Sequence, residues 1–311
     1  MTTIEKIHHS PAARPQRTEQ VRTSRLLHAT DLLPKSEAAM ERAGLLADEL
    51  GAQLKLLHVA APLSSEHALE QTLRNAITNL KARTRAPQWL HSTAPNIAVR
   101  TGNPSRIILE TAEESQADLL ILGPHRKRGL RDVLEGTLAE KALTARCCPL
   151  LIVQQAPRET YNNVLLALDL SATSIPALRA SEALVLGPRS RATVVHAYEP
   201  PYQGMLSYAG VSEQDILAYG NSWRRSAAQD IRDLLRKESK APERYDVWIG
   251  ESHPAAAILR AVEMHRPDLL VLGTHARHRV GRALLGSVAN RLLNLVDCDV
   301  LIVPKAAPVQ H

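Results

Sequence analysis

The chain of 311 residues is poor in aromatic residues and in cysteine. Aromatic residues make up 3% of it, with no phenylalanine, and it has neither zinc-finger spacing nor the aromatic signature of RNA-binding modules. Its three cysteines, two of them the adjacent Cys147 and Cys148, give no disulfide framework and fit a reducing compartment. These absences argue against a nucleic-acid partner and against a disulfide-built secreted domain.

Long apolar runs and catalytic motifs are lacking as well. No run approaches the ~20 residues that a helix needs to cross a bilayer, and residues 1–25 contain no continuous apolar core of a signal peptide. We therefore expect a cytoplasmic protein without a membrane partner. No G-x-S-x-G elbow, no H-E-x-x-H motif and no nucleophile beside a base is present, so we do not expect an enzyme.

Positive charge is in excess but is spread along the chain. The formal net charge is +6, which favours contact with anions. Two local clusters, residues 126–128 and 277–279, fall inside two loops that resemble each other. The charge pattern therefore predicts small anionic ligands before polymers.

A repeat is the strongest feature that the sequence does contain. Residues 118–153 read as strand, loop, helix and strand, and residues 268–304 read the same way. Two units with one loop length indicate one architecture used twice. In each copy a second glycine follows the first by 13 residues, as Gly123 and Gly136 and as Gly273 and Gly286.

The elements before each unit complete two alternating series of strands and helices. In the first series, we expect Ser36 and Ser105 to cap helices. The first series has predicted strands at 25–31, 53–60, 97–100, 118–122 and 150–153 and helices at 36–50, 65–85 and from 105. The second has strands at 163–169, 192–197, 245–249, 269–272 and 300–303 and a long helix at 212–239.

Equivalent landmarks fix the domain organisation. Asp169 and His196 follow Asp31 and His58 by 138 residues, whereas the later glycines are 150 residues apart, so twelve extra residues lie between them. Alternating strands and helices predict the α/β class, with two tandem doubly wound domains, each a five-stranded parallel sheet flanked by helices. We expect a disordered tail at 1–22, domains at 23–154 and 163–306, and a linker at 155–162.

The order of the landmarks resembles the universal stress protein family in its tandem form. A first-strand Asp, a turn with glycine and proline after strand three, and a spaced glycine loop ending in Gly-Ser or Gly-Thr occur twice, within about residues 23–305. The resemblance implies an adenine-nucleotide alpha-hydrolase-like fold and a stress-response regulatory protein that binds ATP, alone or with Mg²⁺. It leaves slow ATP hydrolysis compatible with the fold.

The physical argument for a nucleotide site is independent of the resemblance. In an open parallel sheet the ligand lies outside the carboxyl ends of the strands, where the strand order reverses. Glycine lets a phosphate approach the backbone, and the following helix offers N–H groups. The resemblance implies that the Asp lies near the adenine and ribose and the glycine loop near the phosphates. The candidate residues are Asp31, Gly123, Gly136 and Thr137 in the first domain and Asp169, Gly273, His275, Arg277, Gly286 and Ser287 in the second.

One departure from the family pattern separates the two domains. The second glycine of the G-x2-G loop is Arg126 in the first domain and Ala276 in the second. Arg126 either fills the site or offers a guanidinium fork to phosphate, and we favour occlusion. The first loop also carries Asp132 and Glu135, whereas the second carries three arginines and no acid. We therefore expect nucleotide in the second domain.

The same residues suggest other interpretations, of which we reject a P-loop and disfavour a metal site, while two roles stay open for the aspartates and for the strand-end histidines. Residues 281–287 have P-loop glycine spacing but lack its lysine, and His275 and His278 lack the flanking ligands of a metal site. Asp31 and Asp169 are also suited to capping the turns that follow them. The histidines at positions 58 and 196 either contact a ligand or pack at a strand end.

The fifth strands suggest how the domains associate. An apolar strand at a sheet edge invites pairing, and family members commonly pair two domains through this strand. One chain then supplies both halves of an internal pseudo-dimer, and a further homodimer stays open. The alternative to a nucleotide-binding protein is a nucleotide-free interaction scaffold whose crevices are filled by side chains.

Overall fold

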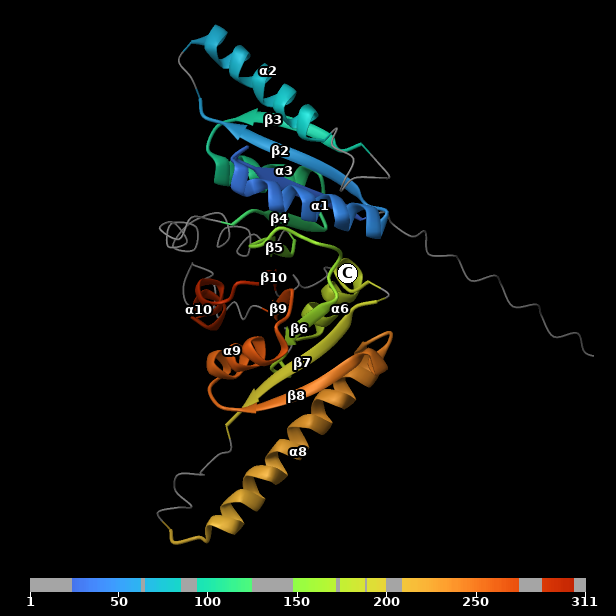
Figure 1. The fold of residues 1–311 in the computed structure, drawn as a ribbon, viewed down its shortest axis with the longest axis vertical. Helices are drawn as coiled ribbons and strands as arrows, with labels where there is room; N and C mark the ends of the chain where they lie inside the picture. Colours follow the sequence, from blue (N-terminus) through green and yellow to red (C-terminus); the bar gives the residue numbers. More distant parts are fainter. Residues whose placement is uncertain are drawn as a thin grey trace, which may run out of the picture.

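A computed structural model describes the chain at residues 24–62, 65–84, 94–124, 148–171, 174–187, 189–199, 209–273 and 287–304. Strands and helices alternate through two successive halves, and Figure 1 shows them stacked along the long axis of the molecule. We call residues 24–153 the first half and residues 161–304 the second half. The segment 154–160 connects them.

The first half contains the five predicted strands. β2 has the bounds that the sequence predicted, and the other four differ from the prediction by one residue at one or both ends. The elements are β1 (Arg25–Thr30), α1 (Glu37–Leu50), β2 (Gln53–Ala60), α2 (Glu66–Arg83), β3 (Asn96–Thr101), α3 (Pro104–Glu114), β4 (Leu119–Leu122) and β5 (Leu150–Ile152).

The second half repeats the series with one longer helix. The helix after its second strand, α8, has 26 residues against 18 in α2, which accounts for most of the insertion that the spacing of the landmarks indicated. The elements are β6 (Asn163–Ala167), α6 (Ser174–Leu184), β7 (Arg191–Tyr198), α8 (Glu213–Glu238), β8 (Tyr245–Glu251), α9 (Pro254–His265), β9 (Leu269–Gly273), α10 (Ser287–Leu295) and β10 (Asp299–Val303).

The described strands form one continuous ten-stranded sheet. Its order is β3-β2-β1-β4-β5-β10-β9-β6-β7-β8. Pairing is parallel within each half, whereas β5 and β10 pair antiparallel and join the halves. The two doubly wound parallel units and the pairing of their fifth strands are therefore as predicted.

Each face of this sheet carries one apolar core that crosses the junction. On one face, buried residues of α1, α2, α6 and α8 pack against the strands of both halves, and on the other α3, α9 and α10 do so. Because both faces are covered, the central strands are mostly apolar on both sides, as in the run Leu119–Leu122. The halves therefore share their cores as well as their sheet.

Two predicted helix caps differ in the structure. α3 begins one residue earlier than expected, and the side chain that caps it is Asn103, which accepts a hydrogen bond from the amide of Arg106 at 3.2 Å. Asparagine is among the strongest N-cap residues, so Ser105 falls inside the helix. The hydroxyl of Ser36 makes no capping bond to α1. It binds Asp31 instead.

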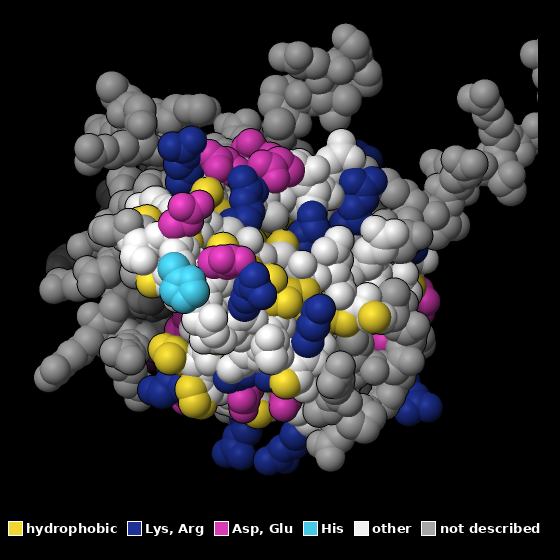
Figure 2. Space-filling model, turned by 90° about the horizontal axis from the view of Figure 1, so that it is seen from above, with side chains coloured by type: hydrophobic (Ala, Val, Ile, Leu, Met, Phe, Trp, Pro, Cys, Tyr) yellow, Lys and Arg dark blue, Asp and Glu magenta, His cyan; other side chains and the backbone are white. Residues whose placement is uncertain are grey.

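Charges of both signs are interspersed on the end of the molecule that carries α2, β3 and α3. Figure 2 shows lysine and arginine side chains next to acidic ones on this face. Several are ion pairs, such as Arg100 with Glu114 at 2.9 Å and Arg106 with Glu110 at 2.6 Å. On the described part of this face, the net positive charge does not gather into one basic patch.

Candidate functional site

The two predicted crevices lie where the strand order reverses in each half. The chain runs outward from β1 to β3 and returns to the other side of β1 with β4, and the second half does the same with β6 and β9. Asp31 and Gly123 follow the ends of β1 and β4, while Asp169 follows β6 and Gly273 ends β9. The structure therefore brings each Asp and glycine to adjacent strand ends, at the edge where open parallel sheets bind ligands.

In the first half, the loop between β1 and α1 is closed by its own side chains. Oδ1 of Asp31 accepts hydrogen bonds from the amide of Leu33, at 3.0 Å, and from the hydroxyl of Ser36. Gly123 lies against this loop, since a Cβ built there would stand 3.5 Å from Cα and Oγ of Ser36. The aspartate, the serine and the glycine thus form one cluster.

The second half builds the same loop from equivalent residues. Oδ1 of Asp169 accepts from the amide of Ser171 at 3.0 Å and from the hydroxyl of Ser174 at 2.9 Å, whose oxygen accepts from the amide of Asp169. Both aspartates therefore cap the turn that follows, which is one of the two roles the sequence allowed. Asp31 and Asp169 are also exposed, so a ligand can reach them.

Each loop holds a leucine in the left-handed backbone conformation. Leu32 has φ 63° and Leu170 has φ 61°, directly after the two aspartates. This conformation costs a residue with a Cβ about 1–2 kcal/mol. The side chain of Leu32 packs against the core, whereas that of Leu170 is 37% exposed. Strained backbone of this kind gathers at functional sites, and no feature of the sequence indicated it.

A histidine supports each loop from the neighbouring strand. Nδ1 of His58 lies 2.9 Å from the carbonyl oxygen of Thr30, and Nδ1 of His196 lies 2.8 Å from that of Leu168. A carbonyl oxygen only accepts hydrogen bonds, so Nδ1 carries the proton in both rings. These contacts fix the backbone directly before each aspartate, which corresponds to the packing role among the two that the sequence left open.

Several candidate residues lie outside the described part of the chain. They are Gly136, Thr137, His275, Arg277 and Gly286, together with Arg126 and Ala276, which distinguish the two loops. Ser287 begins α10, but only its backbone is described. The phosphate side of either crevice therefore stays a prediction from the sequence.

A buried histidine in the middle of β1 was not predicted from the sequence. His28 has no exposed surface, and its Nδ1 bonds the carbonyl oxygen of Ile121 at 3.1 Å, while its Nε2 has no hydrogen-bond partner among the described residues. Burial lowers the pKa of His28 to about 4, against the raising effects of that hydrogen bond and of Asp31. The ring is therefore neutral at pH 7.

A cleft of about 1090 Å³ lies between the halves, away from the predicted crevices. Side chains of both charges line it, including Arg158 and Arg266 together with Glu263 and Asp297. It also contains Cys298, whose thiol has its pKa raised to about 12 by burial and nearby carboxylates, so it is not a nucleophile near neutral pH.

The described residues contain neither a cluster suited to a metal ion nor a helix suited to a membrane span. In these stretches no three His, Cys, Asp or Glu side chains are grouped closely enough to hold a metal ion. Nor does any helix among them have the length and apolar character that a membrane span requires.

Comparison with known proteins places the chain among relatives of one kind. The model of the "Universal stress protein family" matches residues 23–154 and again residues 160–304. A universal stress protein of Thermus aquaticus is 30% identical over 143 residues, which covers 46% of this chain and 98% of the relative. One from Mycolicibacterium smegmatis is 22% identical and covers 89% of this chain and 96% of its own.

A solved structure extends the likeness to the tandem arrangement. The universal stress protein of Archaeoglobus fulgidus superposes with a TM-score of 0.66 over 90% of this chain and 96% of its own, at 18% identity. That identity supports the fold alone. Two matches of the family model, one for each half and together spanning most of the residues, establish the conclusion: the chain belongs to the universal stress protein family.

Proposed function

We propose that the protein is a regulatory protein that binds an adenine nucleotide, ATP alone or with Mg²⁺, at the carboxyl edge of its sheet. The observation that carries the proposal is the pairing of an exposed aspartate with a glycine where the strand order reverses, in each half. An exposed carboxylate at a strand end is suited to the hydroxyl groups of a ribose, and a glycine permits close approach of phosphate. The family resemblance supports the same ligand.

The second half is the proposed site of binding. Arg126 stands in the first loop where the family pattern has glycine, and that loop also carries Asp132 and Glu135. The second loop has Ala276 at the same place, with arginines around it and no acid. The second loop therefore presents arginines to a phosphate without a competing acid, whereas the first presents charges of both signs and a long side chain in place of glycine.

The output of binding is a change of conformation or of protein contacts rather than catalysis. The two halves share one sheet and two cores. A ligand that binds one state of a crevice more tightly shifts the whole molecule toward that state. We propose that this occurs in the cytoplasm and that the pseudo-dimer within one chain is the working unit.

The test compares one substitution placed in each half. Nucleotide released from the freshly purified protein is identified by mass spectrometry, and the emptied protein is titrated with Mg-ATP by calorimetry. Gly286→Val fills the proposed phosphate position of the second half, and Gly136→Val is its matched control in the first. We expect about one adenine nucleotide per chain, lost with Gly286→Val and kept with Gly136→Val.

The outcomes separate the competing assignments. Two nucleotides per chain would show that Arg126 assists phosphate binding, and loss of binding with Gly136→Val alone would move the site to the first half. A protein that carries no nucleotide and gives no heat on titration refutes the proposal.

A nucleotide-free scaffold is the second candidate. The observation that favours it is that Oδ1 of Asp31 and Oδ1 of Asp169 are each already occupied by a backbone amide and a serine hydroxyl. In this case the aspartates hold the loops and the surface binds proteins. Saturable micromolar binding of ATP to the purified protein would exclude it.

A further inference from the structure

The strand pairing that joins the halves does not by itself select a partner. β5 and β10 pair antiparallel with Leu151 opposite Leu301, two residues that the repeat makes equivalent. Both strands are short and buried, and apart from Asp299 their residues are apolar. Because backbone ladders carry little sequence information, the same edge would accept a like strand from a second copy of the chain. Any selectivity must come from side chains around the junction.

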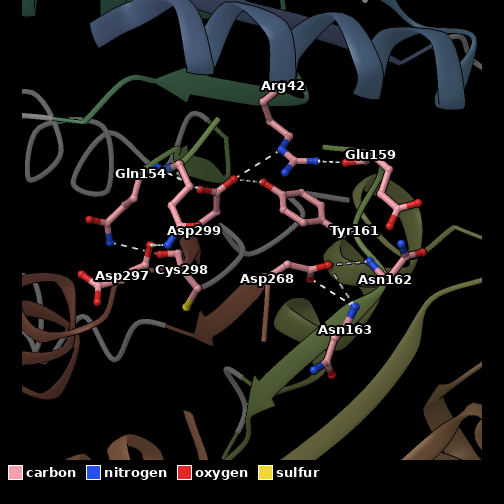
Figure 3. A network of polar contacts seen from close by, with 11 residues as sticks. Arg42, Gln154, Glu159, Tyr161, Asn162, Asn163, Asp268, Asp297, Cys298 and Asp299 are labelled. Atoms are coloured by element: carbon pink, nitrogen blue, oxygen red, sulfur yellow. Dashed lines mark hydrogen bonds and ion pairs between the residues drawn. The ribbon is translucent and has the colours of Figure 1, made fainter. Parts of the chain in front are cut away.

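Three buried side chains provide a contact of that kind. Arg42 of α1, in the first half, lies against Tyr161 and Asp299 of the second half (Figure 3), and we call these three residues the clasp. Arg42 Nε lies 3.3 Å from Asp299 Oδ2, and the guanidinium carbon lies 3.9 Å above the centre of the Tyr161 ring. The Tyr161 hydroxyl donates to Asp299 Oδ2 at 2.6 Å.

The connecting segment completes the clasp. Arg42 Nη1 donates to the carbonyl oxygen of Glu159 at 2.7 Å, and the amide of Gln154 donates to Asp299 Oδ1 at 2.8 Å. The side chains of Arg42 and Asp299 are only 6% and 2% exposed. Burial raises the pKa of Asp299 although these hydrogen bonds and Arg42 lower it, so the carboxylate depends on its partners to stay ionised.

The clasp exists on one side of the junction only. The offset that relates Asp31 to Asp169 makes Ala180 the equivalent of Arg42, and the offset that relates Cys148 to Cys298 makes Pro149 the equivalent of Asp299. An alanine and a proline provide no charge. The repeat therefore creates two equivalent places around the junction, and the sequence fills one of them with an ion pair.

A second contact on the same face has the same one-sided character. The carboxylate of Glu49, near the end of α1, occupies the space that a side chain at Gly187 would take. These two residues are equivalent under the repeat. A position that touches its own equivalent lies close to the axis relating the halves, and here it combines a glutamate with a glycine.

Pairing of like halves from two copies would break both contacts. Two first halves would place Arg42 opposite Pro149 and would bring two Glu49 carboxylates together. Two second halves would place Asp299 opposite Ala180. Either arrangement leaves a buried charge without its counter-ion, which is much more costly than the gain from a correct buried pair. A buried ion pair is weak evidence for stability, and fixing which surfaces pair is its best-attested role.

We propose that the clasp is a recognition element that lets the junction accept a first-half surface against a second-half surface and rejects like halves. The partner that each surface fits is the other half of its own chain. The like half of a second copy is therefore excluded from this edge of the sheet. The proposal concerns assembly and does not depend on nucleotide binding.

The test removes the charges of the clasp while keeping its shape. Arg42→Met with Asp299→Asn gives an uncharged clasp of similar size in the full-length chain. Glu49→Cys is the reporter, because position 49 meets its own copy when two first halves pair. Each chain is unfolded, refolded at about 1 µM and about 100 µM, oxidised, and analysed for dimers that reductant dissolves, since linked halves misassemble during refolding at high concentration.

We expect few linked dimers from the reporter chain with an intact clasp. The uncharged clasp is expected to give roughly tenfold more at the higher concentration, because the penalty on like halves is gone. Arg100→Ala with Glu114→Ala in the reporter background is the matched control, as it removes an ion pair within the first half and is expected to change nothing. Chains without Glu49→Cys measure any linkage through the native cysteines.

If the double variant folds poorly, Asp299→Asn alone in the reporter chain provides a second measurement of linked dimers. It removes the charge that opposes pairing of two second halves and leaves Arg42 without its counter-ion in the native pairing, so linked dimers are again expected to rise. If circular dichroism shows these variants folded and linked dimers stay at the level of the intact clasp at both concentrations, the clasp does not select partners and the proposal is overturned.

Discussion

The two halves of the chain agree most closely at the loop that follows the first strand of each. Asp31 with Ser36 and Asp169 with Ser174 make the same hydrogen bonds, and His58 and His196 hold the same carbonyl position. Away from this loop the halves diverge. The shared part is therefore the edge at which we propose that a ligand binds, and the divergent parts give each half contacts of its own.

The divergence is clear in the cores. His28 in β1 corresponds to Leu166 in β6, and both are fully buried. In the third strands, Arg100 pairs with glutamates of α3, whereas the strand register makes Gly250 its equivalent, beside which Trp248 packs against the core. The same strand position thus accepts a polar or an apolar side chain. The great majority of buried polar atoms in proteins are hydrogen-bonded, so a polar side chain at such a position has to be judged by its partners.

The largest effect is expected where the halves meet. Leu151→Ala and Leu301→Ala each remove a fully buried side chain from facing positions in the junction ladder. We expect each to lower the free energy of unfolding by about 2–5 kcal/mol and, because the positions are equivalent, by nearly the same amount. Chemical denaturation measures both. A much larger loss at one position would show that the junction depends more on one half than on the other.

A second prediction concerns His28 and Leu166, which occupy equivalent positions inside the first strand of each half. The folded-state pKa of His28 is about 4, below the ordinary value of 6.5, so the unfolded chain binds more protons between these two values. The neutral ring therefore favours the folded state fully above pH 6.5. As the pH falls toward 4, the free energy of unfolding decreases by up to about 3 kcal/mol.

We therefore expect His28→Leu to flatten the loss of unfolding free energy between pH 6.5 and pH 4. The reverse change in the second half, Leu166→His, is expected to steepen it. Thermal unfolding measured across this pH range checks both variants. An acid profile that stays the same with His28→Leu would show that other groups cause the acid sensitivity.

The smallest effect is expected at the left-handed leucines. Glycine adopts this conformation without strain, which gains about 1–2 kcal/mol, but it loses any packing of the side chain. Leu170→Gly is therefore expected to be neutral or slightly stabilising. Leu32→Gly is expected to be destabilising because Leu32 packs against the core. Equal losses in the two variants, measured by thermal unfolding, would contradict this assignment.

The sequence predicted the strands well because their signals are local. In the run Gln53–Ala60 apolar residues recur at short intervals after a polar start. The structure has the bounds that the sequence predicted for this strand. The pairing of the fifth strands followed from their apolar character together with what the family resemblance implies. The role of Ser36 was missed since a serine before a helix normally caps it, and only the return of the loop to Asp31 draws the hydroxyl away.

The clasp could not be predicted from the sequence. Arg42 is a single polar residue on the inner side of an amphipathic helix, and Asp299 is the first residue of a strand that is otherwise apolar. They are 257 residues apart, and no local pattern indicates that they meet. Their contact forms only when the two complete halves dock, and that docking depends on the packing of many residues in both cores.

The antiparallel junction has a consequence for synthesis on the ribosome. The open side of β5 is covered by β10, which is translated about 150 residues later. At translation rates of roughly 5–20 residues per second, the first half waits on the order of 10–30 s with an uncovered apolar strand edge. During that interval the nascent chain is open to neighbouring chains and to chaperones, and the emergence of its last strand ends the exposure.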